Sequence, residues 1–284
     1  MSDRFLCPAC TFDKISYSYV KEGYDVWRCE GCGTMFVHDV PDAMDLEKIY
    51  AAADYYEMKI DSERRIQKEN IRRLKIIKKY KIGGSFFDIG CARGLLLDEA
   101  KSAGYDTFGI ELSRENVKLC EDKNHKVIHG YLDSCQSIVP TGGFDVITCL
   151  DVIEHVEEPI DFLRTAASML NEYGIMVVST PNYSGLVARI LKMKDPYMTP
   201  PEHLNYFTHE GMSNIFQKNC LLIKKKVTFG YLVESELGRV FSKYGSAFLA
   251  PVEPFVKPLI PFVMHGLNAI NMGLEQEFYL SKGE

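Results

Sequence analysis

Short apolar segments alternate with amphipathic ones through the middle of this 284-residue chain, and this alternation limits the fold more than any other feature. Segments typical of buried strands are 85–90 (SFFDIG), 106–112 (DTFGIEL), 126–130 (KVIHG), 144–150 (FDVITCL) and 174–180 (GIMVVST). Segments typical of helices are 95–104 (LLLDEAKSAG), 113–123 (SRENVKLCEDK) and 159–170 (PIDFLRTAASML). Alternation of this kind requires a parallel sheet with helices on both faces. Because 221–229 and 275–282 supply two late strands, the sequence predicts an α/β, doubly wound, mostly parallel sheet of seven strands.

The turn after the first strand, FFDIGCARG (86–94), lies where open α/β sheets bind ligands. It lacks the G-x-G-x-x-G fingerprint of dinucleotide-binding folds, because Cys-Ala-Arg separates Gly90 from Gly94. Asp88 is unfavourable beside a diphosphate but suits an ammonium group. Glu111 ends the second strand, where a carboxylate can accept both hydroxyls of a ribose. The two acids predict a nucleoside that carries an amino acid and no phosphate, which describes S-adenosylmethionine.

Four segments in order resemble the class I S-adenosylmethionine-dependent methyltransferases, which have a Rossmann-like sheet. DIGCARG (88–94) is similar to their D-x-G-x-G-x-G loop, and FGIEL (108–112) to their acidic ribose strand. HGYLD (129–133) is similar to their adenine-side segment, and FDVITCLDVIEHV (144–156) to their fourth-strand motif. The resemblance covers about residues 82–284.

This resemblance implies a set of cofactor-binding residues. Carried over position by position, the methionine end of the cofactor would contact Asp88, Gly90, Cys91, Gly94 and Leu150, and Ala92 and Asp151 are further cofactor-binding candidates. Glu111 would hold the ribose, and the adenine would be bordered by Leu112, Tyr131 and Leu132. The chain departs from the family at Ala92, which replaces the middle glycine and adds a methyl group that is expected to crowd the cofactor.

An acid–histidine cluster follows the fourth strand in LDVIEHVEEP (150–159). Asp151, Glu154 and His155 have the spacing i, i+3, i+4, so a helical turn would place them on one face. His203, in the loop after the fifth strand, is expected at the same edge of the sheet. Methyl transfer to a hydroxyl requires alignment and removal of a proton, which a neutral histidine can take. The sequence predicts His155 or His203 as the base, with Glu154 orienting it.

Two other interpretations of the cluster stay open. DVIEHV and the later histidine resemble the Glu-x-x-Glu-His…His cluster of metal-dependent small-RNA 3′-terminal 2′-O-methyltransferases, and related clusters occur in ubiquinone-pathway O-methyltransferases. That resemblance implies a second divalent ion, which binds the acceptor hydroxyls, although Asp151 stands where the pattern has the longer glutamate. In the remaining interpretation, Glu154 and His155 only cap and pack a helix.

Four of the nine cysteines form two C-x-x-C pairs: Cys7, Cys10, Cys29 and Cys32. Between the pairs, ISYSYV and YDVWR predict a two-stranded ribbon. Four thiolates at this spacing suit a structural, tetrahedral zinc ion, with iron as the main alternative. A zinc ribbon is therefore predicted over residues 1–40. A ribbon ahead of a methyltransferase domain is also similar to the nucleotide-sugar C-methyltransferases, whose additional C-terminal domain this chain lacks.

Residues 41–81 are expected to form a helical linker or cap, with one apolar face formed by Ile66, Ile71, Leu74 and Ile77. The stretch 59–81 carries ten Lys and Arg residues against three acids, a net charge of +7. Most such charge runs are solvated faces, and we expect the same here. The alternative is a partner with phosphate groups or an anionic membrane.

A helical lid is expected between the last two strands, at about 235–273. In the resembled fold such an insertion packs over the acceptor side. The aromatic residues of the lid are Phe241, Tyr244, Phe248, Phe255 and Phe262. We expect them to form the core of the lid. The alternative is that they contact a lipid-linked or aromatic acceptor, or a second subunit. Further candidates to face the acceptor are Tyr183, Tyr197 and Tyr206.

The net charge of −6 argues against a general nucleic-acid binder. Nine cysteines without a secretion signal favour a cytoplasmic protein, and no apolar segment is long enough to span a bilayer. The sequence predicts an enzyme that methylates a small-molecule or glycan acceptor, at oxygen. The alternatives are a metal-dependent RNA or quinone-precursor O-methyltransferase, a sugar C-methyltransferase and a non-catalytic cofactor-binding scaffold.

Overall fold

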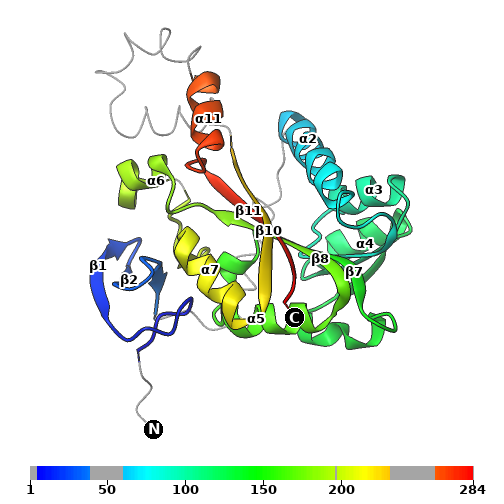
Figure 1. Ribbon diagram of the computed structural model, residues 1–284, viewed down its shortest axis with the longest axis horizontal. Coiled ribbons are helices and arrows are strands. Elements are labelled where there is room, and N and C mark those ends of the chain that lie inside the picture. The colour runs from blue at the N-terminus through cyan, green and yellow to red at the C-terminus, as the bar shows by residue number, and fades with distance from the viewer. Residues whose placement is uncertain (1–4, 39–59, 196, 231–259, 284) are drawn as a thin grey trace.

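The computed structural model describes residues 5–38, 60–195, 197–230 and 260–283, which form two sheets (Figure 1). Sheet B has the strand order β10-β11-β8-β7-β4-β5-β6. Its strands are β4 (Gly84–Ile89), β5 (Tyr105–Glu111), β6 (Lys126–His129), β7 (Phe144–Leu150), β8 (Leu170–Pro181), β10 (Leu221–Phe229) and β11 (Glu275–Lys282). Strands β4 to β8 are parallel, and β11 is antiparallel to both of its neighbours. The predicted mostly parallel, seven-stranded sheet is confirmed.

Helices cover both faces of sheet B, and alternate residues of each strand point to opposite faces. Phe86, Val146 and Val177 share a core with the helices α2 (Ile60–Ile77), α3 (Leu95–Ser102) and α4 (Arg114–Asp122). The neighbouring residues Phe87 and Ile147 belong to a core on the other face. That core is covered by α5 (Pro159–Ser168), α7 (His209–Lys218) and the 3₁₀ segment η2 (Leu132–Ile138). Short segments complete the described chain: η3 (Ile153–His155), α6 (Leu186–Leu191), η4 (Lys192–Lys194) and α11 (Ile260–Ala269).

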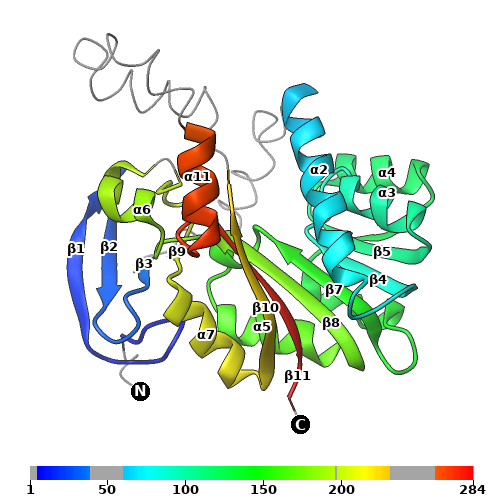
Figure 2. The same cartoon turned by 45° about the horizontal axis from the view of Figure 1, so that its top comes forward.

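Sheet A stands beside sheet B, with α7 between them (Figure 2). It contains β1 (Ile15–Lys21), β2 (Tyr24–Cys29), β3 (Met35–Val37) and β9 (Asn205–Tyr206), in that order. The first three strands and the turns that carry the cysteine pairs, residues 5–38, are called the N-terminal ribbon below. The fourth strand comes from the loop after β8, so sheet A crosses the boundary predicted at residue 40.

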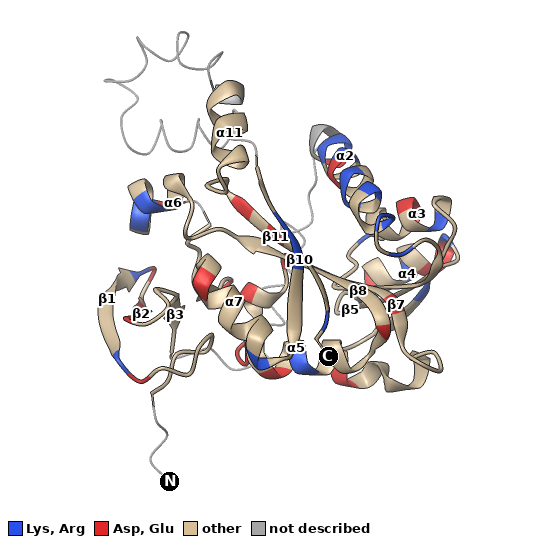
Figure 3. Ribbon diagram, in the orientation of Figure 1, with Lys and Arg blue, Asp and Glu red and all other residues tan. Residues whose placement is uncertain are grey.

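Helix α2 carries a cluster of basic residues (Figure 3), and not all of them are solvated. The predicted apolar face is wrong at Ile71, which is 38% exposed, whereas Asn70 and Arg73 are buried. Arg73 Nε lies 2.5 Å from Glu277 Oε2, and Arg72 Nη2 lies 3.0 Å from both oxygens of Glu277. Burial alone would raise the pKa of Glu277, but the charges of the two arginines lower it overall. These two ion pairs connect α2 to β11.

The described residues leave out part of the predicted linker and most of the predicted lid. The lid residues outside the described ranges include Phe241, Tyr244, Phe248 and Phe255. In the described part of the lid, α11 leaves Phe262 78% exposed, while Met264 is buried. Among the helices that the structure describes, none combines the length and apolar character needed to cross a bilayer.

Candidate functional site: a cofactor loop beside an acid–histidine cluster

The loop from β4 to α3 is tightly wound. Gly90 and Gly94 have left-handed φ values of 73° and 74°. The amides of Gly90 and Cys91 both donate to Ile110 O on β5, at 2.9 and 3.1 Å. A Cβ atom on Gly90 would lie 2.7 Å from Val152 Cγ2, so only glycine fits this position without a shift. The predicted cofactor turn is therefore held against the second strand and the end of the fourth.

Ala92, the departure from the family pattern, has a φ of 44°. The left-handed region costs a residue with a Cβ atom about 1–2 kcal/mol relative to the right-handed one. In this conformation its amide donates to Glu111 Oε2 at 2.9 Å. The backbone of Ala92 therefore orients the acid that was predicted to hold the ribose.

Glu111 is buried at the end of β5, and both of its carboxylate oxygens already accept a backbone hydrogen bond. The second donor is the amide of Ser113, 2.9 Å from Oε1. A carboxylate has about four lone-pair sites, so about two remain for the two hydroxyls of a ribose. Ser113 also caps α4 through its side chain, which accepts a hydrogen bond from Asn116 N.

Asp88 is buried at the end of β4, where its Oδ1 accepts a hydrogen bond of 2.6 Å from Thr148 Oγ1. Burial raises the pKa of Asp88 to about 7, against the opposing effects of Thr148 and the Arg73 charge. A buried carboxyl with this pKa gains a cationic partner favourably. Its environment therefore fits the ammonium group of a bound amino acid.

The residues expected around the adenine lie at the ends of β5 and β6. Leu132 is buried, Leu112 is half-buried and Tyr131 is 58% exposed. Together with the glycine loop, Asp88 and Glu111, they lie along the carboxyl edge of sheet B. This edge fits an amino-acid-bearing nucleoside better than a dinucleotide, because a buried acid occupies the position where a diphosphate would need donors.

The structure brings together Glu154, His155 and His203. Their ligand atoms all lie within 4.8 Å of one another, and the two imidazole rings meet edge to face with centroids 4.7 Å apart. Glu154 and His155 lie on the 3₁₀ turn η3, just after β7. His203 comes from the loop between β8 and β9, as the sequence predicted, at the same edge of the sheet.

Both histidines direct Nδ1 at a backbone carbonyl oxygen. His155 Nδ1 lies 2.6 Å from Glu202 O, and His203 Nδ1 lies 2.8 Å from Tyr197 O. A carbonyl can only accept, so Nδ1 carries the proton and Nε2 is the basic nitrogen of the neutral ring. Burial lowers the pKa of His155, and burial together with the neighbouring His155 lowers that of His203 to about 3. Both rings are neutral at physiological pH.

Glu154 is buried, and its Oε2 atom has no hydrogen-bond partner among the described residues. Burial and the charge of Asp151 raise its pKa well above the ordinary value for a glutamate. An anionic oxygen here requires a cation or a proton donor from outside the described chain. Two neutral imidazoles fixed through Nδ1, beside one unpartnered carboxyl oxygen, are typical of a divalent-metal site.

Asp151 lies outside this group, because residues 151–155 do not form the expected helical turn. It has a left-handed φ of 55°, and its Oδ1 accepts a hydrogen bond of 2.8 Å from Ser179 Oγ on β8. Asp151 is exposed at the strand end, so a contact with the cofactor stays a prediction.

Several polar residues at this edge were missed by sequence reasoning. Thr148 lies opposite Asp88 in the β4–β7 register, which only the strand pairing reveals. Glu275, on β11, is half-buried as a residue, but its Oε2 atom is buried, and burial and the neighbouring acids raise its pKa well above the ordinary value. Tyr183 and Tyr206, expected to face the acceptor, pack edge to face in a core that includes Val26 and Val37 of the N-terminal ribbon. Tyr197 is half-buried and contributes its carbonyl.

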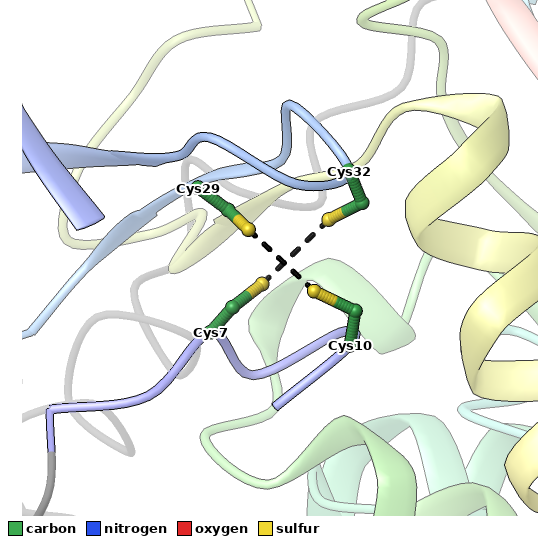
Figure 4. Close-up of side chains that lie close together, drawn as sticks. All are labelled: Cys7, Cys10, Cys29 and Cys32. Carbon is green, nitrogen blue, oxygen red and sulfur yellow. Dashed lines mark hydrogen bonds between the residues drawn. The ribbon is translucent and has the colours of Figure 1, made fainter. Parts of the chain in front are cut away.

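The four ribbon cysteines point toward a common centre (Figure 4). Cys7 Sγ lies 3.7 Å from Cys32 Sγ, and Cys10 Sγ lies 3.5 Å from Cys29 Sγ. Tetrahedral zinc with Zn–S bonds of about 2.3 Å separates its sulfur ligands by about 3.8 Å. The spacing of the cluster therefore fits zinc, and the two predicted pairs converge on one site.

The strand order, the glycine loop and the two acids together define a class I S-adenosylmethionine-dependent methyltransferase domain with a Rossmann-like sheet. Residues 61–219, more than half of the chain, match the family described as "Methyltransferase domain". This chain belongs to that family.

Similarity to a ubiquinone biosynthesis enzyme covers part of the chain. A ubiquinone biosynthesis O-methyltransferase of Bradyrhizobium diazoefficiens is 34% identical over 116 residues, which are 40% of this chain and 44% of that protein. The match therefore spans less than half of the relative.

Solved structures show the same fold. A SAM-dependent methyltransferase from Archaeoglobus fulgidus has a TM-score of 0.55 at 19% identity, covering 78% of this chain and 95% of the other. Magnesium protoporphyrin IX methyltransferase from Synechocystis, solved with bound S-adenosylhomocysteine, has a TM-score of 0.55 at 15% identity, covering 85% and 100%.

Proposed function

We propose that this protein transfers a methyl group from S-adenosylmethionine to a hydroxyl oxygen of a small-molecule or glycan acceptor. The observation that carries the proposal is the convergence of Glu154, His155 and His203 at the sheet edge that also holds the cofactor loop. The ubiquinone biosynthesis O-methyltransferases among the relatives support oxygen as the acceptor atom.

The residues divide between the two substrates. Asp88 would bind the cofactor ammonium and Glu111 its ribose, and the bound cofactor supplies an electrophilic methyl group. On the acceptor side, Nε2 of His155 or His203 would accept a hydrogen bond from the acceptor hydroxyl and take its proton. The lowered pKa of His203, about 3, makes this ring a weak base. Positioning of the hydroxyl is therefore its larger contribution.

A metal-assisted version of the same reaction is the second candidate. It is favoured by the three donors within 4.8 Å and by the unpartnered Oε2 of Glu154. Glu154, His155 and His203 would hold a divalent ion, whose charge lowers the pKa of a coordinated hydroxyl. A weakly basic His203 that is neutral at physiological pH suits a ligand better than a base.

We further propose that the cysteine cluster holds a structural zinc ion. Four sulfur ligands complete a tetrahedral site, so zinc there would have no open position for a substrate.

The decisive experiment follows a labelled methyl group from the cofactor into a pool of cell-extract metabolites. We expect incorporation by the wild-type protein and a loss of about 10²–10⁴-fold in His203→Gln and His155→Gln, with unchanged cofactor affinity by calorimetry. His265→Gln, at an exposed position on α11, is the control and should match the wild type. Wild-type rates in both cluster variants would remove the cluster from the mechanism, and no incorporation at all would favour a scaffold.

A chelator arm separates the two versions. If a metal assists, treatment with chelator abolishes transfer, and Mg²⁺ or Mn²⁺ restores it. If a histidine acts without a metal, the rate stays unchanged after the protein is treated with chelator and then given only enough Zn²⁺ to fill the cysteine cluster.

A further inference from the structure

The loop that carries His203 is built into the N-terminal ribbon. β9 begins two residues after His203 and pairs with β3 through Met35↔Tyr206 and Phe36↔Asn205. The amide of Val37 donates to Leu204 O at 2.9 Å. The ribbon therefore fixes the backbone directly after His203.

The same short segment reaches the other two members of the cluster. The amide of Leu204 donates to Glu154 O at 2.9 Å, and Asn205 Nδ2 donates to Val156 O at 2.7 Å. Leu204 and Asn205 thus bridge β3 and η3. A displacement of β3 would therefore act on the backbone that connects His203 to η3.

Thr208 connects this segment to the cysteine cluster itself. Its Oγ1 donates to Cys32 O at 2.6 Å and accepts from Gly211 N at 3.0 Å, which makes Thr208 the N-cap of α7. One hydroxyl thereby joins a cysteine turn to the start of a helix of the methyltransferase domain.

Helix α7 also packs closely against the cysteine turns. A Cβ atom on Gly211 would overlap Thr34 Oγ1, and the Thr34 carbonyl accepts from Cys29 N at 2.9 Å. At the other end of α7, Lys218 Nζ donates to Thr11 Oγ1 at 3.0 Å, next to Cys10. Cys7, Cys29 and Cys32 share a core with Phe207 and Met212.

We propose that the N-terminal ribbon is a positioning element of the acceptor site: zinc bound by its cysteines fixes His203 against Glu154 and His155, through Thr208 and the β3–β9 pairing. The expected effect on the methyl-transfer rate rests on the proposed function. The expected effect on the position of His203 rests only on the contacts described above. Zinc at the cysteines then has a role in the rate as well as in stability.

The test uses the full-length protein with histidine side chains labelled with ¹⁵N, and His203→Gln and His155→Gln assign the two rings by NMR. All metal is removed with a chelator, and Zn²⁺ is then restored only in the amount that the four cysteines bind, so that none is left for Glu154, His155 and His203. We expect the His203 and His155 ring signals to shift on removal and return on addition of Zn²⁺, while the signal of exposed His265 stays in place. Unchanged cluster signals in the zinc-free protein would overturn the proposal.

Variants that spare the cysteines cover the case in which the zinc-free protein unfolds. Thr208→Val removes the hydrogen bond to Cys32, and Thr208→Ser keeps it. We expect Thr208→Val to retain zinc and cofactor affinity but to shift the His203 signal and lower kcat about ten- to hundredfold, with Thr208→Ser near the wild type. Gly211→Ala should behave as Thr208→Val does.

A Thr208→Val protein with wild-type kcat and an unmoved His203 signal would contradict the inference, because a merely structural threonine would change only the melting temperature. If the wild-type protein transfers no methyl group, the proposed function fails, but the NMR arm still decides whether zinc positions the cluster.

Discussion

Asp88 has a pKa near 7, so the affinity for S-adenosylmethionine should depend on pH around neutrality. In the proposed function, the carboxylate form of Asp88 binds the cofactor ammonium, and the protonated form does not. As pH falls from 7 to 6, the carboxylate fraction falls from about one half to about one tenth, so we expect the dissociation constant to rise about fivefold. Isothermal titration calorimetry across this range measures it.

Two variants test the assignment. Asp88→Asn should bind weakly with a flat pH dependence in this range. Thr148→Val, which removes the hydrogen bond to Asp88 Oδ1, should raise the pKa of Asp88 further and move the loss of affinity to higher pH. A wild-type protein whose affinity is constant between pH 6 and 7 would contradict the role of Asp88.

At the scale of residues, the sequence predicted what is local. The loop glycines, Asp88 and Glu111 follow from short motifs, and the structure has them in the turn after β4 and at the ends of β4 and β5. Thr148 could not be predicted as a partner of Asp88, because the two residues are 60 positions apart and meet only through the β4–β7 register.

At the scale of elements, one carboxylate, that of Glu277, accepts both ion pairs between α2 and β11. We expect Glu277→Gln to lower the free energy of unfolding by about 3–5 kcal/mol, because it leaves the buried Arg73 charge without its partner. Urea denaturation measures this change. The exposed pair Arg164–Asp161 is the control, and Arg164→Ala should cost less than about 1 kcal/mol. Equal effects of the two substitutions would show that the α2–β11 pair contributes no more than a surface pair.

The boundaries of most strands follow from the sequence, and those of β10 and β11 coincide with the predicted segments. The face of α2 was misjudged because a run of basic residues is normally solvated, and the carboxylate that buries Arg73 lies 204 positions away. The turn η3 replaced the expected helical turn because Asp151 takes a left-handed conformation and binds Ser179.

At the scale of the whole molecule, the ribbon and the methyltransferase domain should unfold together, because sheet A and two of the cores contain residues of both. The single tryptophan, Trp27, lies on β2 of the ribbon and reports its unfolding by fluorescence. Far-UV circular dichroism reports the larger sheet B. We expect the two thermal transitions of the zinc-loaded protein to coincide. Midpoints that differ by more than the error of measurement would show an independent ribbon.

The sequence predicted a strand ribbon at the N-terminus and an α/β sheet after it, but not the strand pairing that joins the two. Seven strands in alternation with helices are visible in the apolar pattern, whereas β9 has only two residues and no strand signal of its own. β9 pairs with β3 only because the folded ribbon and the folded methyltransferase domain bring the two strands together.

The pairing of β3 with β9 has a consequence for biosynthesis. The two strands are about 170 residues apart in the chain. At about 5–20 residues per second, the ribosome completes β9 roughly ten to thirty seconds after β3 has been made. During that interval the nascent ribbon presents an unpaired edge and its thiols without the cover of α7, so metal capture before the rest of the polypeptide emerges would protect it from aggregation and oxidation.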